Sequence, residues 1–531
     1  MPSGPPLNFR DFHLGLNVLD SPRLLEDSNC RDCMNIQGTT AGAIVKRTGL
    51  VTLATPSDPL SSLIACEGAP TLSLVGSAGT TLVSIIASGA VNVIKSSGVT
   101  AGARWEGLLG PVVSGQGPLY MANGVDAPTQ WSAATAGVAT GNWSSTAGSL
   151  SGAEYVNGIP NCKYNTQANN QIYMAGNPAA PNRVYVSGIK DPTLWDPSVV
   201  SSPVTGQGAA TSFDVDANDG QQITAIGRIG PYVGVWKPRK TYVIITPGSI
   251  ATGDVLNIRR LSDSIGCVAN RSITSGSLGT YFLSEGRGVY VTNGSKITPI
   301  SDKVLPIITQ VGAQMSQAAG FYFSGHYYLS IASRGAGAND LTLDYDEILQ
   351  SWWKHSFGSN EMVAWHSAGV PFMYSAKPSV AIVDQCFAPG VYQDNGVPFN
   401  WVWRGPWQSP SFFRRRLYPS TYYRKRLRQI RLEGFGTVDY YLARDFLLNE
   451  SLIRANCFPG TLTGLQPFGG GGGNFGSGSG VFGGGGPVGK AELFSLGVAN
   501  AFSQVFSATS STQDEVLSYT LALTDRVDRW D

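Results

Sequence analysis

This chain of 531 residues has little charge, few histidines and almost no helical periodicity. Lys, Arg, Asp and Glu make up 14% of its residues, whereas an average soluble domain has roughly 25%. The formal net charge is +1, so no polyanion-binding surface is spread over the whole chain. Such a low charge is typical of a subunit that packs against neighbouring copies. We therefore expect assembly in preference to a single large β domain.

Long apolar runs and a disulfide pattern are also missing. No stretch approaches the roughly 18 apolar residues of a membrane span. Residues 1–6 lack the basic and apolar regions of a signal peptide, so we expect none. An odd number of cysteines at scattered spacings argues against a disulfide framework and predicts reduced thiols made in a cytoplasm. The seven cysteines are Cys30, Cys33, Cys66, Cys162, Cys267, Cys386 and Cys457.

Catalytic motifs are equally scarce, and the sequence predicts neither an enzyme nor a cofactor. The four histidines are His13, His326, His355 and His366. The chain contains no HExxH motif, nucleophile elbow or triad framework. Asp344 and Asp346 form a carboxylate pair of the type used in glycoside hydrolysis. However, Asp is ordinary at a strand-to-turn position, and the sequence does not place the two carboxylates across a bond.

Three segments resemble metal or phosphate sites but differ from them in detail. Residues 30–33 form a single CxxC motif, whereas a zinc site needs four ligands. Residues 214–220 place oxygen ligands as a calcium loop does, but the glycine comes one residue late and Ala225 stands at the closing Glu position. Residues 484–491 nearly form a phosphate-binding loop, but Ala491 replaces the hydroxyl that binds magnesium. We interpret the three as structural thiols, a turn and the end of a linker, and we predict no metal site.

The dominant pattern is a short aromatic or apolar strand followed by a Gly or Asn-Gly turn. Residues 119–124, 172–176, 184–188 and 289–294 are examples. Tyr, Val and Ile suit a pleated, half-buried surface, and Gly and Asn accept the positive φ of tight hairpin turns. The chain is therefore predicted to be all-β. Units of about 40–50 residues leave room for a β-propeller of about six to eight blades.

Composition also predicts the domain organisation. We expect an extended N-terminal arm (1–48), the β-propeller (49–400), a basic and aromatic β region (401–466), a Gly-rich loop (467–490) and a C-terminal strand region (491–531). The arm has too little apolar periodicity to fold alone, so we expect it to pack on other chains. The loop has almost no side chains to pack and a high entropy of ordering, which indicates flexibility.

The only charge cluster is a basic run in the region that follows the predicted propeller. Its residues are Arg414, Arg415, Arg416, Arg424, Lys425, Arg426 and Arg428. Interleaved or adjacent aromatics include Trp401, Trp403, Phe412, Tyr418 and Tyr422. Arg with aromatic side chains is found where proteins track a phosphate backbone and stack bases, and also at protein interfaces. We favour the interface, because the charge in the rest of the chain is balanced.

Several segments, taken in order, resemble the β-propeller tail proteins of tailed phages, including the nozzle and packaged-DNA stabilisation proteins. They are residues 8–12 with 15–17 and 47–49, residues 121–131, residues 184–188 with 191–195, residues 219–226 with 236–237 and 241–242, and residues 263–268 with 282–284 and 300–303. The resemblance covers about residues 8–355. It implies a hexameric ring of propellers that extends the portal–adaptor channel and acts in DNA retention and ejection.

The hypothesis from sequence is therefore a virion structural protein of the phage tail, synthesised in the host cytoplasm. Its expected partners are further copies in a homohexamer, the portal and adaptor proteins, the tail fibres and the genomic double-stranded DNA. The alternative is a propeller that binds or depolymerises host surface glycans, with Trp352 and Trp353, or Trp401 and Trp403, stacking on sugars. A third interpretation is a nucleic-acid-binding module at residues 414–431, whose binding would weaken steeply as salt rises.

Overall fold

The computed structural model of this chain divides into two compact units. It describes residues 7–22, 24–66, 73–110, 118–132, 139–145, 150–199, 210–245, 257–367, 369–407, 425–444, 450–454, 489–499 and 502–525. One unit comprises Thr52–Glu347 and Ser356–Cys386. The other comprises Met1–Val51, Ile348–His355 and Phe387–Asp531.

Seven four-stranded sheets follow one another within the described residues, and we number them as blades 1 to 7. Blade 1 has β8 (Leu60–Cys66), β9 (Ser73–Ala78), β10 (Thr81–Ile86) and β11 (Val91–Lys95); blade 2 has β12 (Glu106–Leu109), β13 (Leu119–Ala122), β14 (Thr129–Trp131) and β15 (Gly141–Asn142); blade 3 has β18 (Tyr164–Ala168), β19 (Gln171–Asn177), β20 (Ala180–Val186) and β21 (Thr211–Asp214); blade 4 has β22 (Ala225–Ile229), β23 (Tyr232–Trp236), β24 (Thr241–Ile245) and β25 (Asn257–Ser262).

Blades 5 to 7 complete the set. Blade 5 has β26 (Thr274–Ser275), β27 (Thr280–Ser284), β28 (Gly288–Thr292) and β29 (Ile297–Pro299); blade 6 has β30 (Ala319–Phe323), β31 (His326–Ile331), β32 (Leu341–Asp346) and β33 (Ser351–His355); blade 7 has β34 (Glu361–Ser367), β35 (Val370–Ala376), β36 (Val383–Ala388) and β7 (Gly49–Ala54). Strand β7 precedes blade 1 in the sequence and supplies the outer strand of blade 7.

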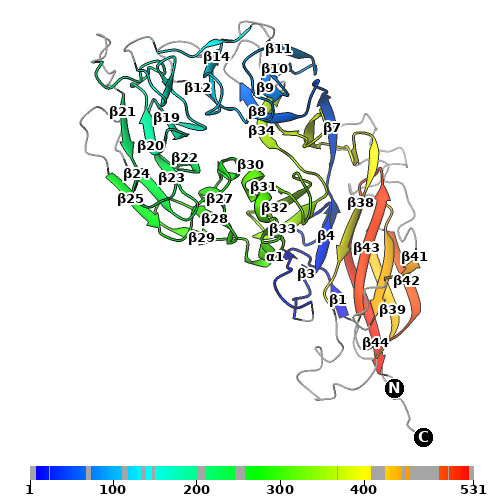
Figure 1. Cartoon of the computed structure of the whole chain (residues 1–531). Helices are drawn as coiled ribbons and strands as arrows, with labels where there is room; N and C mark the ends of the chain where they lie inside the picture. The colour runs from blue at the N-terminus through cyan, green and yellow to red at the C-terminus, as the bar shows by residue number, and fades with distance from the viewer. Residues whose placement is uncertain are drawn as a thin grey trace, which may run out of the picture. The chain divides into compact units, whose positions relative to one another are not determined.

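The seven blades close into a ring, which confirms the predicted β-propeller and gives its blade number. The first strand of each blade contacts the first strand of the next, and β34 of blade 7 contacts β8 of blade 1. The first strands therefore surround the axis, and the later strands of each blade lie progressively farther out (Figure 1). A propeller of this kind protects nearly all of its sheet edges by radial repetition.

The strands have hydrophobic residues on both faces because each blade packs between two others. In β19 every residue is buried. Ile172 and Met174 pack with residues of blade 2 such as Trp143, whereas Tyr173 and Ala175 pack with residues of blade 4. This alternation is the two-residue period of a strand buried on both sides. Asn169 and Asn170 form the turn before β19 with φ of 51° and 59°, a conformation that Asn accepts better than most residues.

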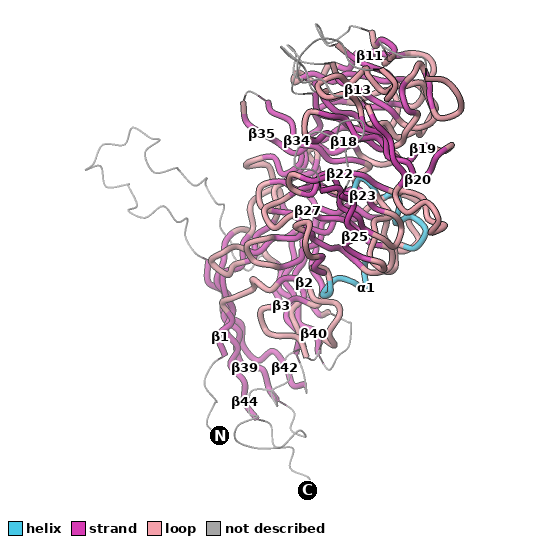
Figure 2. The backbone as a smooth tube through the Cα atoms, turned by 90° about the vertical axis from the view of Figure 1, so that its left-hand side faces the viewer, coloured by secondary structure: helices cyan, strands magenta, loops and turns pink. Residues whose placement is uncertain are grey.

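The second unit contains two six-stranded sheets. One has β1 (Leu7–Phe9), β5 (Ile36–Gly38), β6 (Ile44–Lys46), β39 (Lys425–Phe435), β42 (Gly489–Ala499) and β44 (Glu515–Asp525); the other has β4 (Asp32–Met34), β37 (Gln393–Asp394), β38 (Val397–Arg404), β40 (Asp439–Arg444), β41 (Ser451–Arg454) and β43 (Phe502–Ser510). Trp403 of one sheet lies between Phe506 of the same sheet and Tyr519 of the other, at ring-centroid distances of 5.4 and 6.2 Å. The two sheets therefore pack face to face, and we call this unit the sandwich. Figure 2 labels β1, β39, β42 and β44 of the first sheet and β40 of the second.

The segment expected to be an extended arm, residues 1–48, contributes β1, β4, β5 and β6 to the sandwich. In β1, Phe9 pairs with Tyr519 and stacks on its ring. Each of these strands is three residues long, so they carry no periodicity that a sequence could reveal. Residues 467–488 of the Gly-rich loop lie outside the described residues.

Helices are short in the described part of the chain. The α-helix is α1 (Leu305–Ile308), accompanied by the 3-10 turns η1 (Asn270–Ser272), η2 (Asp302–Val304) and η3 (Gly312–Gln317). Two small pairings complete the description, β2 (Gly15–Leu16) with β3 (Asn29–Cys30) and β16 (Tyr155–Val156) with β17 (Ile159–Pro160). Among the described residues, no helix has the length and apolarity needed to cross a bilayer.

Candidate functional site at the propeller axis

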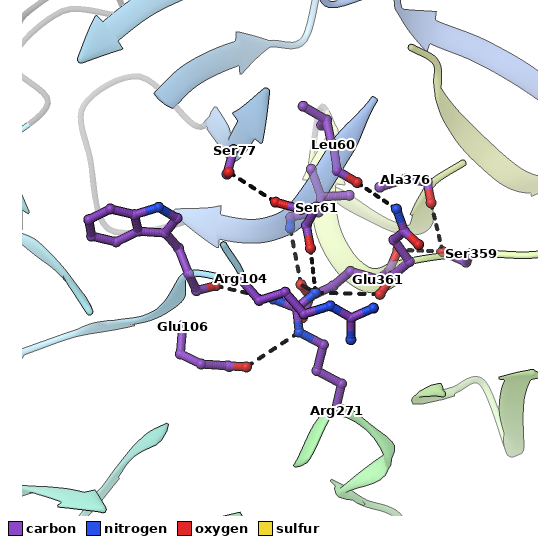
Figure 3. A network of polar contacts seen from close by, with 12 residues as sticks. Leu60, Ser61, Ser77, Arg104, Glu106, Arg271, Ser359, Glu361 and Ala376 are labelled. Atoms are coloured by element: carbon purple, nitrogen blue, oxygen red, sulfur yellow. Dashed lines mark hydrogen bonds and ion pairs between the residues drawn. The ribbon is translucent and has the colours of Figure 1, made fainter. Parts of the chain in front are cut away.

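A buried arginine joins several blades at the propeller axis. Arg271 lies in η1, in the connection between blades 4 and 5, and its side chain is 4% exposed. Its Nη1 donates to the carbonyl oxygen of Ser61 in blade 1 at 2.7 Å and pairs with Glu361 Oε2 of blade 7 at 2.7 Å. Its Nε lies 3.3 Å from Glu106 Oε1 of blade 2. Figure 3 shows these side chains converging from separate strands on one guanidinium.

The charges of this cluster balance, with two arginines and two glutamates. Burial raises the pKa of Glu361, Glu106 raises it further, and Arg271 and Arg104 oppose the shift. The backbone N–H of Leu63 also donates to Glu361 Oε2, at 3.1 Å. Burial and the charge of Arg271 lower the pKa of Arg104 to about 10, so this side chain remains charged at neutral pH.

The cluster lies at one end of the inner strands. Glu106 and Glu361 are the first residues of β12 and β34, and Ser61 is the second residue of β8. Arg271 therefore links blades 1, 2 and 7 from the opposite side of the ring. Desolvation offsets much of the Coulomb attraction of a buried charged pair. The pairs of Arg271 therefore serve chiefly to fix the positions of the blades relative to one another.

A polar cavity of about 570 Å³ begins at the same level and extends along the inner strands. It is lined by Glu106, Gly107, Leu108, Asn165, Thr166, Gln167, Ala168, Asn169, Asn170 and Arg228. These residues belong to β12, to β18 with the turn that follows it, and to β22. The cavity therefore runs from the ion cluster, through their shared residue Glu106, toward the far ends of β18 and β22.

The side chains of this cavity are set by the pleat of β18. Tyr164 and Ala168 face blade 4, where they pack in the apolar cluster between blades 3 and 4. Asn165 faces blade 2, where its Nδ2 donates to the carbonyl oxygen of Glu106 at 3.1 Å. On the opposite wall the Arg228 guanidinium is exposed and donates to the Gly230 carbonyl oxygen at 3.3 Å. The lining thus presents amides, a hydroxyl, a carboxylate and a guanidinium, which suits hydrogen bonding to a polar molecule.

Sequence reasoning did not find this site. Arg271 lies in an unremarkable Ala-Asn-Arg-Ser segment, and Glu106 and Glu361 stand 255 positions apart in the numbering (361 − 106). Their meeting depends on the closure of the ring. The polar composition of residues 165–170 is the local signal. An inner strand and its turn with four amides in six residues depart from the apolar pattern of the other inner strands.

The acidic loop that resembles a calcium loop is held by lysines. Lys237 Nζ lies 2.8 Å from Asp219 Oδ1, and the Lys237 side chain is fully buried. Lys240 Nζ lies 2.8 Å from Asp216 Oδ2 and 3.0 Å from Asp219 Oδ2. Bonds from Lys240 and Tyr242 lower the pKa of Asp216 to about 2. The ammonium groups occupy the position that a cation would take, in agreement with the interpretation of this segment as a turn.

The candidate glycosidase carboxylates flank a histidine. His326 Nδ1 lies 2.8 Å from Asp344 Oδ1, and His326 Nε2 lies 4.0 Å from Asp346 Oδ2. Burial lowers the pKa of His326, but the charges of Asp344 and Asp346 outweigh it and raise the pKa to about 9. Asp344 is fully buried. Neither carboxylate belongs to the lining of the axial cavity.

The four tryptophans that were expected to stack on sugars are core residues. Trp352, Trp353, Trp401 and Trp403 are each at most 1% exposed. The expectation that they stack on sugars is therefore wrong for the described structure, because their faces are covered by protein. Trp403, for example, is enclosed by Phe12, Phe506 and Tyr519.

The thiols of the CxxC segment are buried in the sandwich. Cys30 and Cys33 are fully buried free cysteines. Burial and the neighbouring Cys33 raise the pKa of Cys30 well above its usual value, which disfavours the reactive thiolate. Among the residues that the structure describes, no group of three or more His, Cys, Asp or Glu side chains is arranged to hold a metal ion.

The basic run falls mostly beyond the described residues. Arg414, Arg415, Arg416 and Arg424 lie outside them, and Lys425, Arg426 and Arg428 lie in β39 without described side chains. Their assignment as interface or DNA-facing residues stays a prediction. Residues 484–488 of the segment that resembles a phosphate-binding loop also lie outside the described residues, and Lys490 and Ala491 belong to β42.

Comparison with known proteins gives likenesses of fold alone. No family model and no curated protein matches the sequence. The chain is similar to the extracellular domain of the putative one component system BT4673 from B. thetaiotaomicron, with a TM-score of 0.39 and 9% identity over 81% of this chain and 57% of that chain. It thus spans little more than half of that relative. It is also similar to XC5397, a gluconolactonase from Xanthomonas campestris, with a TM-score of 0.29 and 12% identity over 72% of this chain and 97% of that chain. Likenesses at this level carry no argument about activity, and the propeller assignment follows from the strand pairing.

Proposed function

We propose that this protein is a virion structural component of a phage tail, a nozzle subunit that assembles into a hexameric ring and extends the portal–adaptor channel. Its action is mechanical: it retains packaged DNA and lets it pass during ejection, without catalysis. Its partners are further copies of itself, the portal and adaptor proteins, the tail fibres and the double-stranded genome.

The observation that carries the proposal is the ordered resemblance of residues 8–355 to the β-propeller tail proteins of phages, and the occupied propeller axis bears on where a DNA conduit would lie. Arg271, Glu106 and Glu361 join blades across the axis, and the cavity beside them has a volume of about 570 Å³. A DNA duplex, whose major groove alone is about 12 Å wide, does not fit through such a propeller. A conduit for DNA therefore has to lie between several copies of the chain, as it does in a ring.

Composition supports the same proposal. With charged residues at 14% and a net charge of +1, the chain has the low, balanced charge suited to subunit contacts and to a channel that does not hold DNA tightly. The basic run at residues 414–428 is assigned here to contacts with neighbouring subunits. DNA contact is the alternative role for that run.

Immunogold electron microscopy of intact phage particles, with antibody against the full chain, tests the location. The expected result is gold confined to the tail vertex. Gold absent from every particle would overturn the proposal. A particle preparation labelled with antibody against the portal protein provides the positive control for access to the vertex.

The ring is tested separately on the purified full chain. Light scattering coupled to size exclusion, followed by negative-stain microscopy, is expected to show closed rings of six copies, either alone or after addition of the adaptor protein. A protein that stays monomeric with the adaptor present would contradict the ring.

A further inference from the structure

We propose that the axial cavity is a binding site for a neutral saccharide, one or two sugar residues in size. This inference goes beyond the structural role proposed above and does not depend on it. It rests on the shape of the cavity, on the hydrogen-bonding groups that line it, and on the charge at each end.

The cavity has the size of a ligand site and is open to solvent. Its volume of about 570 Å³ lies within the roughly 300–1,000 Å³ of small-molecule sites. The ion cluster lies at one end, where Arg271 pairs with Glu106 and Glu361. The ligand would enter from the far end, beside the turn formed by Asn169 and Asn170.

The lining offers both hydrogen-bond donors and hydrogen-bond acceptors. Thr166 and Gln167 are half-buried, and their side chains make no hydrogen bond with another described residue. The Asn165 Nδ2 donates to Glu106, which leaves the Asn165 amide oxygen available as an acceptor. Amides and hydroxyls both donate and accept, as do the neighbouring hydroxyls of a sugar ring.

The site is also fixed before any ligand binds. Arg271 holds the carboxylate of Glu106, and the Glu106 carbonyl oxygen in turn holds the side chain of Asn165. Asn165, Thr166 and Gln167 all belong to β18, which pairs along its length with β19. A pre-arranged polar site loses less entropy on binding than a flexible one.

The distribution of charge favours a neutral ligand. Glu106 stands where the cavity meets the ion cluster and would repel an anion placed beside it. The cation in the lining, Arg228, is exposed at the other wall and already donates to the Gly230 carbonyl oxygen. A hydrophobic ligand would cover amides and a carboxylate without giving them partners, which costs free energy.

The expected affinity is modest. The lining contains no aromatic side chain, so the sugar gains no stacking on a ring. A few hydrogen bonds exchanged against water then give dissociation constants on the order of 1 mM.

Saturation-transfer NMR on the purified full chain tests the proposal, with methyl glycosides of glucose, galactose, N-acetylglucosamine and rhamnose as probes. We expect saturable binding of at least one glycoside. Gln167→Leu and Thr166→Val should each weaken it by about fivefold, because each removes a hydrogen-bonding group. Gln222→Leu is the matched control, since Gln222 is an exposed amide in the loop before blade 4, and it should bind as the unaltered chain does.

Three results would overturn the proposal. The first is that no glycoside of the panel gives a saturable signal. The second is that binding survives unchanged in both cavity variants while circular dichroism shows them folded. The third is that inorganic phosphate competes with the glycoside at equal concentration, which would make this an anion site centred on Arg228. None of these results bears on the location of the protein in the virion.

Discussion

The propeller and the sandwich differ in how far apart along the chain their paired strands lie. In the blades, strands pair with the next one along the chain, as β22 does with β23 and β23 with β24, with the exception of β7 in blade 7. In the sandwich, Phe9 pairs with Tyr519 and Cys33 pairs with Trp403. One region is built from local hairpins, and the other joins segments from the beginning, the middle and the end of the chain.

This difference has consequences for folding. Local hairpins lose little loop-closure entropy and form early, whereas pairings between distant segments are slow. Strand β44 ends at Asp525, so the sandwich cannot be completed until synthesis has passed that residue. The propeller contains two contacts of this kind between segments that are distant in sequence. One is the pairing of β7 with blade 7, and the other is the axial ion cluster.

The largest expected effect comes from removing that cluster. Arg271→Met leaves Glu106 and Glu361 without their shared cation, and we expect a loss of about 4–5 kcal/mol from the free energy of unfolding of the propeller, near the upper end for breaking a buried charged pair. Hydrogen–deuterium exchange followed by mass spectrometry should show faster exchange in β8, β12 and β34, while β38 and β43 of the sandwich stay protected.

The double variant Arg271→Met, Glu361→Gln is the control. It removes one carboxylate along with the cation and leaves Glu106 beside Arg104, so the charges balance again and most of the lost stability should return. Equal exchange in both variants would show that the methionine side chain, and not the unpaired charge, disturbs the axis.

The sandwich has its own buried arginine, and its removal should have a somewhat smaller effect. The Arg47 side chain is fully buried, lies 2.9 and 2.6 Å from the two carboxylate oxygens of Asp394, and stacks on Phe399 at 4.0 Å. Arg47→Met should cost about 3 kcal/mol, because it leaves one carboxylate, which is 22% exposed and can be hydrated. The exchange pattern should be the reverse of that for Arg271→Met, with β38 and β44 losing protection.

Arg47→Lys serves as the comparison for charge alone. Lysine keeps the positive charge but not the two parallel hydrogen bonds or the planar stacking, so it should recover part of the loss. Faster exchange in the inner propeller strands of either Arg47 variant would contradict the independence of the two units.

The blades could be predicted from the sequence because their information is local. The segment at residues 121–131 is recognisable since Asn123 Oδ1 accepts bonds from the backbone N–H groups of Val125 and Asp126. Asp191 forms a similar turn by accepting from the Thr193 N–H. The motifs on which the resemblance to phage tail proteins rests are in part such turns, so they indicate β-hairpins whatever the family of the chain.

The sandwich and the axial site could not be predicted in the same way. Strands of two or three residues, such as β3 and β5, are too short to show a period. Arg271 and its partners meet because the ring closes, and nothing near Arg271 in the sequence specifies Glu361. The tryptophan pairs at 352–353 and 401–403 were misjudged for a related reason: composition alone does not distinguish a buried aromatic from an exposed one.

The smallest expected effect is on the pH dependence of stability. Its sign should be opposite in the propeller and in the sandwich, so it distinguishes the two units most clearly. In the propeller, Asp344 and Asp346 raise the pKa of His326 to about 9 despite burial. The interaction of protonated His326 with these carboxylates therefore stabilises the folded propeller fully below about pH 6.5, and this contribution is lost as the pH rises toward 9. In the sandwich, burial lowers the pKa of Lys46 to about 8 although Asp514 opposes the shift. The unfolded chain then binds more protons at Lys46 above pH 8, so stability increases with pH there.

Exchange rates measured between pH 7 and 9.5, after correction for intrinsic exchange, check this prediction. Protection in β31 and β32 should fall by about 2 kcal/mol over that range, and protection in β6 should increase by a smaller amount. His326→Gln should abolish the fall and leave the increase, whereas Lys46→Met should do the opposite. If both units lose protection in parallel, and if neither variant alters the slope, the titrating groups are not these two, and the electrostatic independence of the propeller and the sandwich fails.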